Sequence, residues 1–160
     1  MAISEKLSQM VQDQIGMELR AERFYLQAST VAAYEGFDTF GNFLRKEAEH
    51  EQWHAKRWTK FAEDLDIIVN AKVTQDNPPA NLHDAIRDAM QMEQLLLDHM
   101  TDMFYLAFEE RYLPVHAFLM AGEKGYEPIR EQMKAIQEWE KMLRRLETED
   151  IADVVAAIDH

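Results

Sequence analysis

The chain has 160 residues, 47% of them hydrophobic, which is enough for one domain with a buried core. Its formal net charge of −13 and pI near 4.8 argue against nucleic acid or an anionic membrane as a partner. Cysteine is absent, so disulfides and thiolate metal sites are excluded and a metal would need oxygen and imidazole ligands. No apolar run is long enough to span a membrane and no signal peptide is recognisable, so we expect one cytoplasmic domain over residues 1–160.

Two long amphipathic helices are predicted in the first part of the chain. Ser4 is a suitable cap for a first helix that runs to about Tyr34, before Gly36. One face of this helix is apolar except for the carboxylate of Glu18. A second helix is expected over residues 39–64, and one side of it reads Phe40, Phe43, Glu47, His50, either Trp53 or His54, Arg57 and Phe61.

A long connection and a third helix follow. Residues 66–80 end in Asn-Pro-Pro, which stops any helix, and so long a segment is expected to span the length of the domain. Asn81 is a suitable cap for a third helix that reaches about residue 108. Glu93 lies in its apolar stripe, so a third helix carries one carboxylate on the side expected to face the core.

The last part of the chain contains several helix breakers. Because Pro114, Gly122 and Gly125 interrupt the pattern, residues 115–121 could form a separate helical turn or the start of the next helix. Pro128 fits the first turn of a helix that continues to about residue 147, although a kinked helix from Pro114 is an alternative. Residues 151–158 are predicted to form a short fifth helix.

The residue types on these helices suggest a metal site. Glu47 and His50 are three residues apart, so a helix directs both to one side, in the Glu-x-x-His arrangement that supplies ligands to carboxylate-bridged metal pairs. Glu18 and Glu93 add carboxylates from two other helices. Buried ionised carboxylates are unfavourable unless paired or bound to a cation, and this ligand set suits iron, manganese or zinc.

On these motifs the chain resembles the non-haem ferritins. The resemblance implies an all-α, ferritin-like four-helix bundle with a long crossover between the second and third helices and a short fifth C-terminal helix. The segments that carry it are residues 18–21 (Glu-Leu-Arg-Ala) with Tyr25, 47–50 (Glu-Ala-Glu-His), 81–85 (Asn-Leu-His-Asp-Ala), 91–94 (Gln-Met-Glu-Gln) and 131–136 (Glu-Gln-Met-Lys-Ala-Ile).

The resemblance also implies roles for individual residues at a di-iron centre. Glu18 and His50 would be ligands of the first iron, Glu47 the bridge and Glu93 a ligand of the second. The remaining residues implied at the centre are Tyr25 as a nearby hydrogen-bonding group, Gln132 beside the second iron, and Glu131 from the same Glu-Gln stretch. Gln137 with Glu140 is an alternative register for the last long helix. Lys46 stands where many ferritins have an acidic residue, which puts a third iron site in question.

The function implied is that of a ferroxidase and iron store. Such a protein oxidises Fe(II) with dioxygen or hydrogen peroxide and keeps the ferric mineral inside a homo-oligomeric shell of twenty-four subunits. No haem is expected, because Ala48 stands where bacterioferritins carry their haem-ligating methionine. Two alternatives differ in function: a di-iron or di-manganese oxidase or peroxide scavenger without storage, and a metal-free acidic helical interaction protein.

Overall fold

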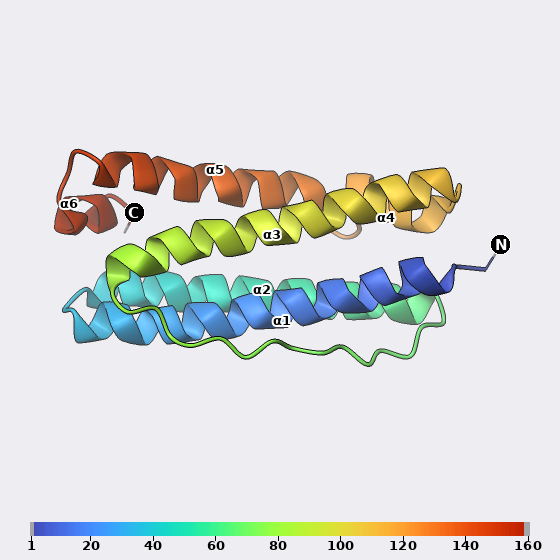
Figure 1. The fold of residues 1–160 in the computed structure, drawn as a ribbon, viewed down its shortest axis with the longest axis horizontal. Coiled ribbons are helices and arrows are strands. Elements are labelled where there is room, and N and C mark those ends of the chain that lie inside the picture. Colours follow the sequence, from blue (N-terminus) through green and yellow to red (C-terminus); the bar gives the residue numbers. More distant parts are fainter. Residues whose placement is uncertain (1, 159–160) are drawn as a thin grey trace.

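Helices make up most of the chain, as its many Ala, Glu, Leu, Met, Gln and Lys residues favour. The computed structural model describes residues 2–158. Within that range the helices are α1 (Glu5–Tyr34), α2 (Asp38–Asp64), α3 (Leu82–Glu109), α4 (Leu113–Ala121), α5 (Pro128–Leu146) and α6 (Ile151–Ala156). The expected all-α bundle with a long crossover and a short C-terminal helix is therefore confirmed (Figure 1).

The first two helices form an antiparallel hairpin that is the base of the bundle (Figure 1). The predicted cap of α1 is present, because the Ser4 hydroxyl accepts a hydrogen bond from the backbone N–H of Leu7 at 3.1 Å. The helix then continues without a break to Tyr34, and α2 begins four residues later, at Asp38. So short a turn makes residues equally far from it in sequence lie level along the two helices.

The crossover between α2 and α3 runs along the outside of α1 from one end of the bundle to the other (Figure 1). Arg20 of α1 donates two hydrogen bonds to the carboxylate of Asp76, at 2.7 and 2.9 Å. Farther along, the carbonyl of Lys72 passes so close to Gly16 that a side chain there would be only 2.1 Å away. These contacts hold the connection on α1, so α3 runs parallel to α2 as predicted.

A turn separates α4 from α5, so the predicted helix that begins at Pro128 is confirmed and the alternative of one kinked helix from Pro114 is excluded. Gly122 adopts φ 69° and ψ −160°, and a Cβ there would lie 1.6 Å from the carbonyl oxygen of Tyr126. The backbone of the turn is closed by a bridge between Glu123 and Tyr126. As a result the Tyr126 side chain is directed into the core, where it is 1% exposed.

The interior consists of two apolar clusters with polar side chains between them. One cluster is built around Tyr25, Phe40 and Trp139, and α6 closes its end of the bundle. The other is built around Trp58 and Tyr126, towards α4. The buried polar residues are Gln14, Glu18, Ser29, Glu51, Glu93 and Gln132. Among residues 2–158, no helix has the length and apolar character needed to cross a membrane.

Candidate metal centre

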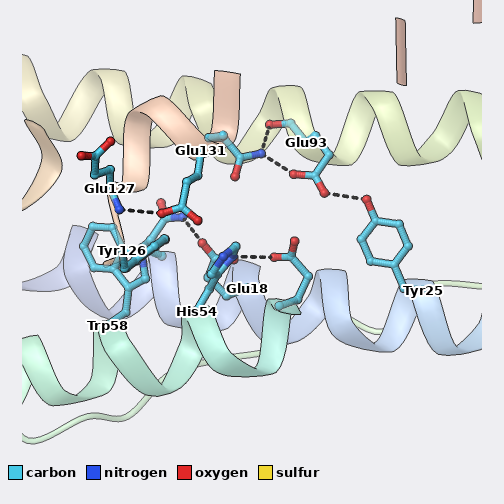
Figure 2. A network of polar contacts seen from close by, with 11 residues as sticks. Glu18, Tyr25, His54, Trp58, Glu93, Tyr126, Glu127 and Glu131 are labelled. Atoms are coloured by element: carbon cyan, nitrogen blue, oxygen red, sulfur yellow. Dashed lines mark hydrogen bonds and ion pairs between the residues drawn. The ribbon is translucent and has the colours of Figure 1, made fainter. Parts of the chain in front are cut away.

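Two helices bring three ligand-type side chains together in the middle of the bundle. They are Glu18 of α1 with Glu51 and His54 of α2, each offering one ligand atom, and these atoms all lie within 4.8 Å of one another. Nδ1 of His54 is 3.7 Å from Oε2 of Glu18 and 3.6 Å from Oε2 of Glu51. Both carboxylates are buried, and Figure 2 shows Glu18 and His54 beside each other.

The facing atoms of this cluster lack hydrogen-bond partners in the described protein. Oε2 of Glu18, Oε2 of Glu51 and Nδ1 of His54 are all buried, and none of them has a hydrogen-bond partner. Buried polar atoms are nearly always satisfied, because burial without a partner costs on the order of 1–3 kcal/mol per group. Three such atoms aimed at one point fit a cation with oxygen and imidazole ligands, such as iron, manganese or zinc.

The protonation of the cluster reflects its crowded charges. Burial raises the pKa of the Glu18 carboxyl, but interactions with His54 and Glu51 outweigh burial and hold this pKa below its ordinary value. The pKa of Glu51 lies well above the ordinary value because of burial and repulsion by Glu93 and Glu18. Burial lowers the pKa of His54, yet its interaction with Glu18 outweighs burial and raises it. A divalent cation would replace the shared protons and relieve this repulsion.

A second carboxylate group borders the cluster from α3. Glu93 accepts a hydrogen bond from the Tyr25 hydroxyl at 2.5 Å, and the Gln132 side chain donates both to the Glu93 carboxylate and to its backbone carbonyl. Figure 2 shows Glu93 directed towards Tyr25 across the bundle. Burial raises the pKa of Glu93, although the hydrogen bonds from Tyr25 and Gln132 act in the opposite direction.

The prediction that Glu47 and His50 occupy the central positions on α2 is wrong. The His50 side chain is 67% exposed, and its Nδ1 lies 3.7 Å from Oε1 of Glu47, on the surface side of the centre. Glu47 is 21% exposed and borders the centre from outside. Burial, followed by repulsion from Glu93 and Glu138, raises the pKa of Glu47 to about 7. The central Glu-x-x-His pair is Glu51 and His54, one helical turn farther along.

Two signals in the sequence could have identified the correct pair. The buried side of α2 alternates steps of four and three residues, and Glu51 falls in this series whereas Glu47 does not. The series is Leu44, Ala48, Glu51, Ala55, Trp58 and Ala62. In addition, Glu18 lies eighteen residues before Gly36 and His54 lies eighteen after it. An antiparallel hairpin turning at Gly36 therefore makes these two residues level.

On α5 the predicted register is correct. Gln132 is buried and faces Glu93, whereas Gln137 and Glu140 of the alternative register are exposed. Glu131 is half-buried, and one of its carboxylate oxygens accepts a hydrogen bond from the backbone N–H of Glu127 at 2.6 Å. Glu131 lines the same pocket as Gln132, but its carboxylate accepts a backbone hydrogen bond at the start of α5 and so stabilises the first turn of that helix.

A pocket of about 620 Å³ between α2 and α5 connects the centre with the surface. Its deep end contains Glu51, His54 and Glu93, and its outer part contains exposed charged groups, so a hydrated ion has a polar route inwards. Six of the twelve lining residues are glutamates, namely Glu47, Glu49, Glu51, Glu93, Glu131 and Glu138. The other six are His50, Trp53, His54, Gln132, Lys134 and Ala135.

An aromatic wall closes the centre towards α4. The Tyr126 ring stacks on the His54 imidazole, with ring centres 4.7 Å apart and planes 17° apart. Its hydroxyl accepts a hydrogen bond from the indole N–H of Trp58 at 3.0 Å. Figure 2 shows Tyr126 and Trp58 on the opposite side of His54 from Tyr25. The pattern of breakers before Pro128 did not predict this contact, since it depends on the turn at Gly122.

Comparisons with known proteins agree with this architecture. A family model described as a ferritin-like domain matches residues 8–148. A "Probable bacterial non-heme ferritin-like protein" from Haemophilus influenzae is 22% identical over 119 residues, covering 73% of this chain and 72% of the relative. A "Bacterial non-heme ferritin" from Escherichia coli is 22% identical over 120 residues, covering the same shares.

A solved structure shows the same fold over almost the whole chain. It is an open pore ferritin from the hyperthermophilic archaeon Archaeoglobus fulgidus, with a TM-score of 0.84 at 18% identity, covering 99% of this chain and 96% of that one. At this identity the likeness is evidence for the fold alone, whereas the family model spans most of the sequence. The bundle, its central carboxylates and the match over residues 8–148 together establish that this chain belongs to the ferritin-like domain family.

Proposed function

We propose that this chain oxidises Fe(II) and stores the ferric product. The observation that carries the proposal is the trio of buried, unpartnered ligand atoms on Glu18, Glu51 and His54, directly beside Glu93. Carboxylates with one imidazole suit Fe(II), and membership of the ferritin-like domain family supports iron as the metal. The relatives named as non-haem ferritins support the same assignment.

Each side chain has a role in this proposal. Glu18 and His54 hold one Fe(II), Glu51 lies between the two ions, and Glu93 holds the second. Gln132 and Tyr25 orient the Glu93 carboxylate, because both donate hydrogen bonds to it. Glu131 stands at the same pocket and adds negative charge near the second ion. Two Fe(II) ions supply two electrons, which reduce dioxygen to hydrogen peroxide, or hydrogen peroxide to water, with two protons taken up.

The outer part of the pocket serves the entry of the ion in this proposal. Glu47 and His50 lie 3.7 Å apart at the surface side, and Glu138 lines the same passage. The carboxylates of Glu47 and Glu138 attract a hydrated cation before it reaches Glu51 and His54, as acidic clefts do for cations. We therefore assign Glu47 and His50 to the entry path of Fe(II) and not to the central ligand set.

Storage requires an assembly that encloses the mineral. We propose twenty-four copies in a hollow shell, a cytoplasmic location and no haem. Size-exclusion chromatography with light scattering tests the shell, because a dimer would instead support a non-storage oxidase or peroxide scavenger. Iron loading tests storage, because a soluble ferric mineral must co-elute with the assembled protein.

Paired double variants test the site. Glu51→Ala/His54→Ala should remove the fast phase of aerobic Fe(II) oxidation and weaken anaerobic Fe(II) binding by at least tenfold. Glu47→Ala/His50→Ala, one turn away on the same helix, should slow oxidation by only a few-fold and leave tight binding in place. Far-ultraviolet circular dichroism must show a folded bundle for both. Equal losses in the two variants, or fast oxidation without Glu51 and His54, would contradict the assignment.

A further inference from the structure

A buried chain of hydrogen bonds connects Glu18 with the far side of the bundle. The side-chain amide of Gln14 lies 3.1 Å from Oε1 of Glu18, one turn away on α1. Its oxygen lies 2.8 Å from Nδ1 of His99, which comes from α3. Gln14 is fully buried, and His99 is half-buried where α3 meets the surface. Neither residue belongs to the cluster of ligand atoms or lines its pocket.

Chemistry determines the direction of each hydrogen bond in this chain. An ionised carboxylate only accepts hydrogen bonds, so the NH₂ group of Gln14 must face Glu18. The carbonyl oxygen of Gln14 then faces His99, and Nδ1 of His99 must carry the proton that it donates. The Glu18 carboxylate therefore sets the orientation of the Gln14 amide, and the hydrogen bond from His99 stabilises the same orientation.

We propose that Gln14 and His99 are positioning residues that hold the Glu18 carboxylate so that Oε2 alone is presented to the metal ion. This inference rests on the proposed function, because it concerns a ligand of the same centre. The observation behind it is that Oε1 of Glu18 is occupied by Gln14, whereas Oε2 is unpartnered and faces His54 and Glu51. Glu18 would therefore bind the ion through one oxygen, while the hydrogen bond to the other oxygen keeps its side chain in one rotamer.

His99 adds to the preference for this orientation, because the two ends of the Gln14 amide are nearly equal in shape. If the amide turned over, its carbonyl oxygen would face Oε1 of Glu18, and the two acceptors would repel each other at 3.1 Å. The burial of Gln14 leaves no bulk water to satisfy that arrangement. The Nδ1–H of His99 therefore acts on Glu18 through Gln14, as outer hydrogen-bond partners do at metal sites.

Cobalt binding provides a readout besides oxidation. Co²⁺ is added anaerobically to the assembled protein, and its visible spectrum reports the ligand geometry while its titration reports the dissociation constant. Gln14→Met removes both hydrogen bonds at nearly constant volume, and His99→Leu removes the donor. Both should weaken Co²⁺ binding by about tenfold or more and alter the spectrum, the size of effect that loss of an outer partner has elsewhere.

Two substitutions serve as matched comparisons. The side-chain N–H of asparagine falls where Nδ1 of histidine lies, so His99→Asn keeps the donor and should bind Co²⁺ within about twofold of the wild type. His83→Leu, on the exposed side of α3, should also leave binding and spectrum unchanged. Weak binding by His99→Asn equal to that of His99→Leu would overturn the proposal.

The outcomes separate this inference from the proposed function. If Glu18→Gln loses Co²⁺ but Gln14→Met and His99→Leu match the wild type, the positioning role is wrong and the metal centre stands. If the wild type itself does not bind Co²⁺, both fail. Should Gln14→Met and His99→Leu misfold, ¹⁵N nuclear magnetic resonance of histidine in the wild-type protein decides, with the His99 signal identified by its absence in the conservative variant His99→Asn. The proposal requires the proton on Nδ1, and a proton on Nε2 alone overturns it.

Discussion

The Tyr25 hydroxyl lies 2.5 Å from Oε1 of Glu93, joining α1 to α3 in the centre of the bundle. Burial, followed by the charges of Glu93 and Glu51, raises the pKa of Tyr25 well above its usual value, so the phenol stays protonated and acts as the donor. The contact satisfies one oxygen of a buried carboxylate, and Gln132 satisfies the other. It stabilises the centre before any ion binds.

Tyr25→Phe should lower the free energy of unfolding of the metal-free protein by about 1–3 kcal/mol, because it leaves a buried carboxylate oxygen without its donor. Urea unfolding at fixed protein concentration measures the change. Tyr34→Phe is the matched control on the same helix, since Tyr34 is 93% exposed, and it should change stability by less than about 0.5 kcal/mol. Equal effects of the two substitutions would show that the Tyr25 hydrogen bond contributes nothing.

Glu47 should make the metal-free protein less stable as the pH rises. Its pKa is about 7 in the folded protein against an ordinary value of 4.5, so between these values the folded state retains a proton that the unfolded chain has released. Its contribution to the free energy of unfolding is thus fully present below about pH 4.5 and is lost as the pH rises through about 7.

Glu47→Gln removes this titration. Relative to the wild type, the variant should gain about 2 kcal/mol of stability between pH 5.5 and pH 8, as a shift of this size implies. Urea unfolding with a chelator present measures it. The exposed Glu140 provides the control, because Glu140→Gln should change stability by less than about 0.5 kcal/mol at either pH. A difference between wild type and Glu47→Gln that is independent of pH would refute this prediction.

Zn²⁺, which is not oxidised, should stabilise the protein through the cluster of unpartnered atoms. At a free concentration one hundred times the dissociation constant, binding to the folded state alone adds about 2.7 kcal/mol. His54→Gln should lose most of this gain, whereas His50→Gln should keep it, because His50 is on the surface side. Thermal unfolding with and without Zn²⁺ gives the comparison, and a gain that depends on His50 instead would show that His50, and not His54, is the ligand on α2.

The turn before α5 should tolerate alanine at one glycine and not at the other. Gly122→Ala directs a Cβ into the Tyr126 carbonyl and should cost more than about 3 kcal/mol, whereas Gly125→Ala meets no atom within 4 Å and should cost about 1 kcal/mol from its positive φ. Because Trp58 donates to Tyr126, only Gly122→Ala should change tryptophan fluorescence. Equal costs would mean that the turn does not hold Tyr126 in place.

Much of the fold could be predicted because its signals are local. Ser4 and Asn81 cap their helices through contacts within one turn, and the Asn-Pro-Pro segment ends the crossover by excluding a helix. On α1 and α3 the carboxylates of Glu18 and Glu93 stand alone in apolar stripes, so periodicity identified them as buried. Local signals do not decide the break between α4 and α5, because a proline and two glycines permit either a kink or a turn.

Periodicity and local hydrogen bonding in the sequence specify the long helices, the crossover and the buried positions of Glu18 and Glu93. The tertiary structure decided which Glu-x-x-His pair on α2 is central. Glu47 and Glu51 differ by one turn, about 40° around the axis and about 6 Å along it, so both lie near the same face. The packing of α2 level with Glu18 and opposite Glu93 brings Glu51 and His54 into the centre and leaves Glu47 and His50 at its entrance. The buried series on α2 and the equal spacing about Gly36 agree with this pair, but they identify it only once the two helices are placed as a hairpin.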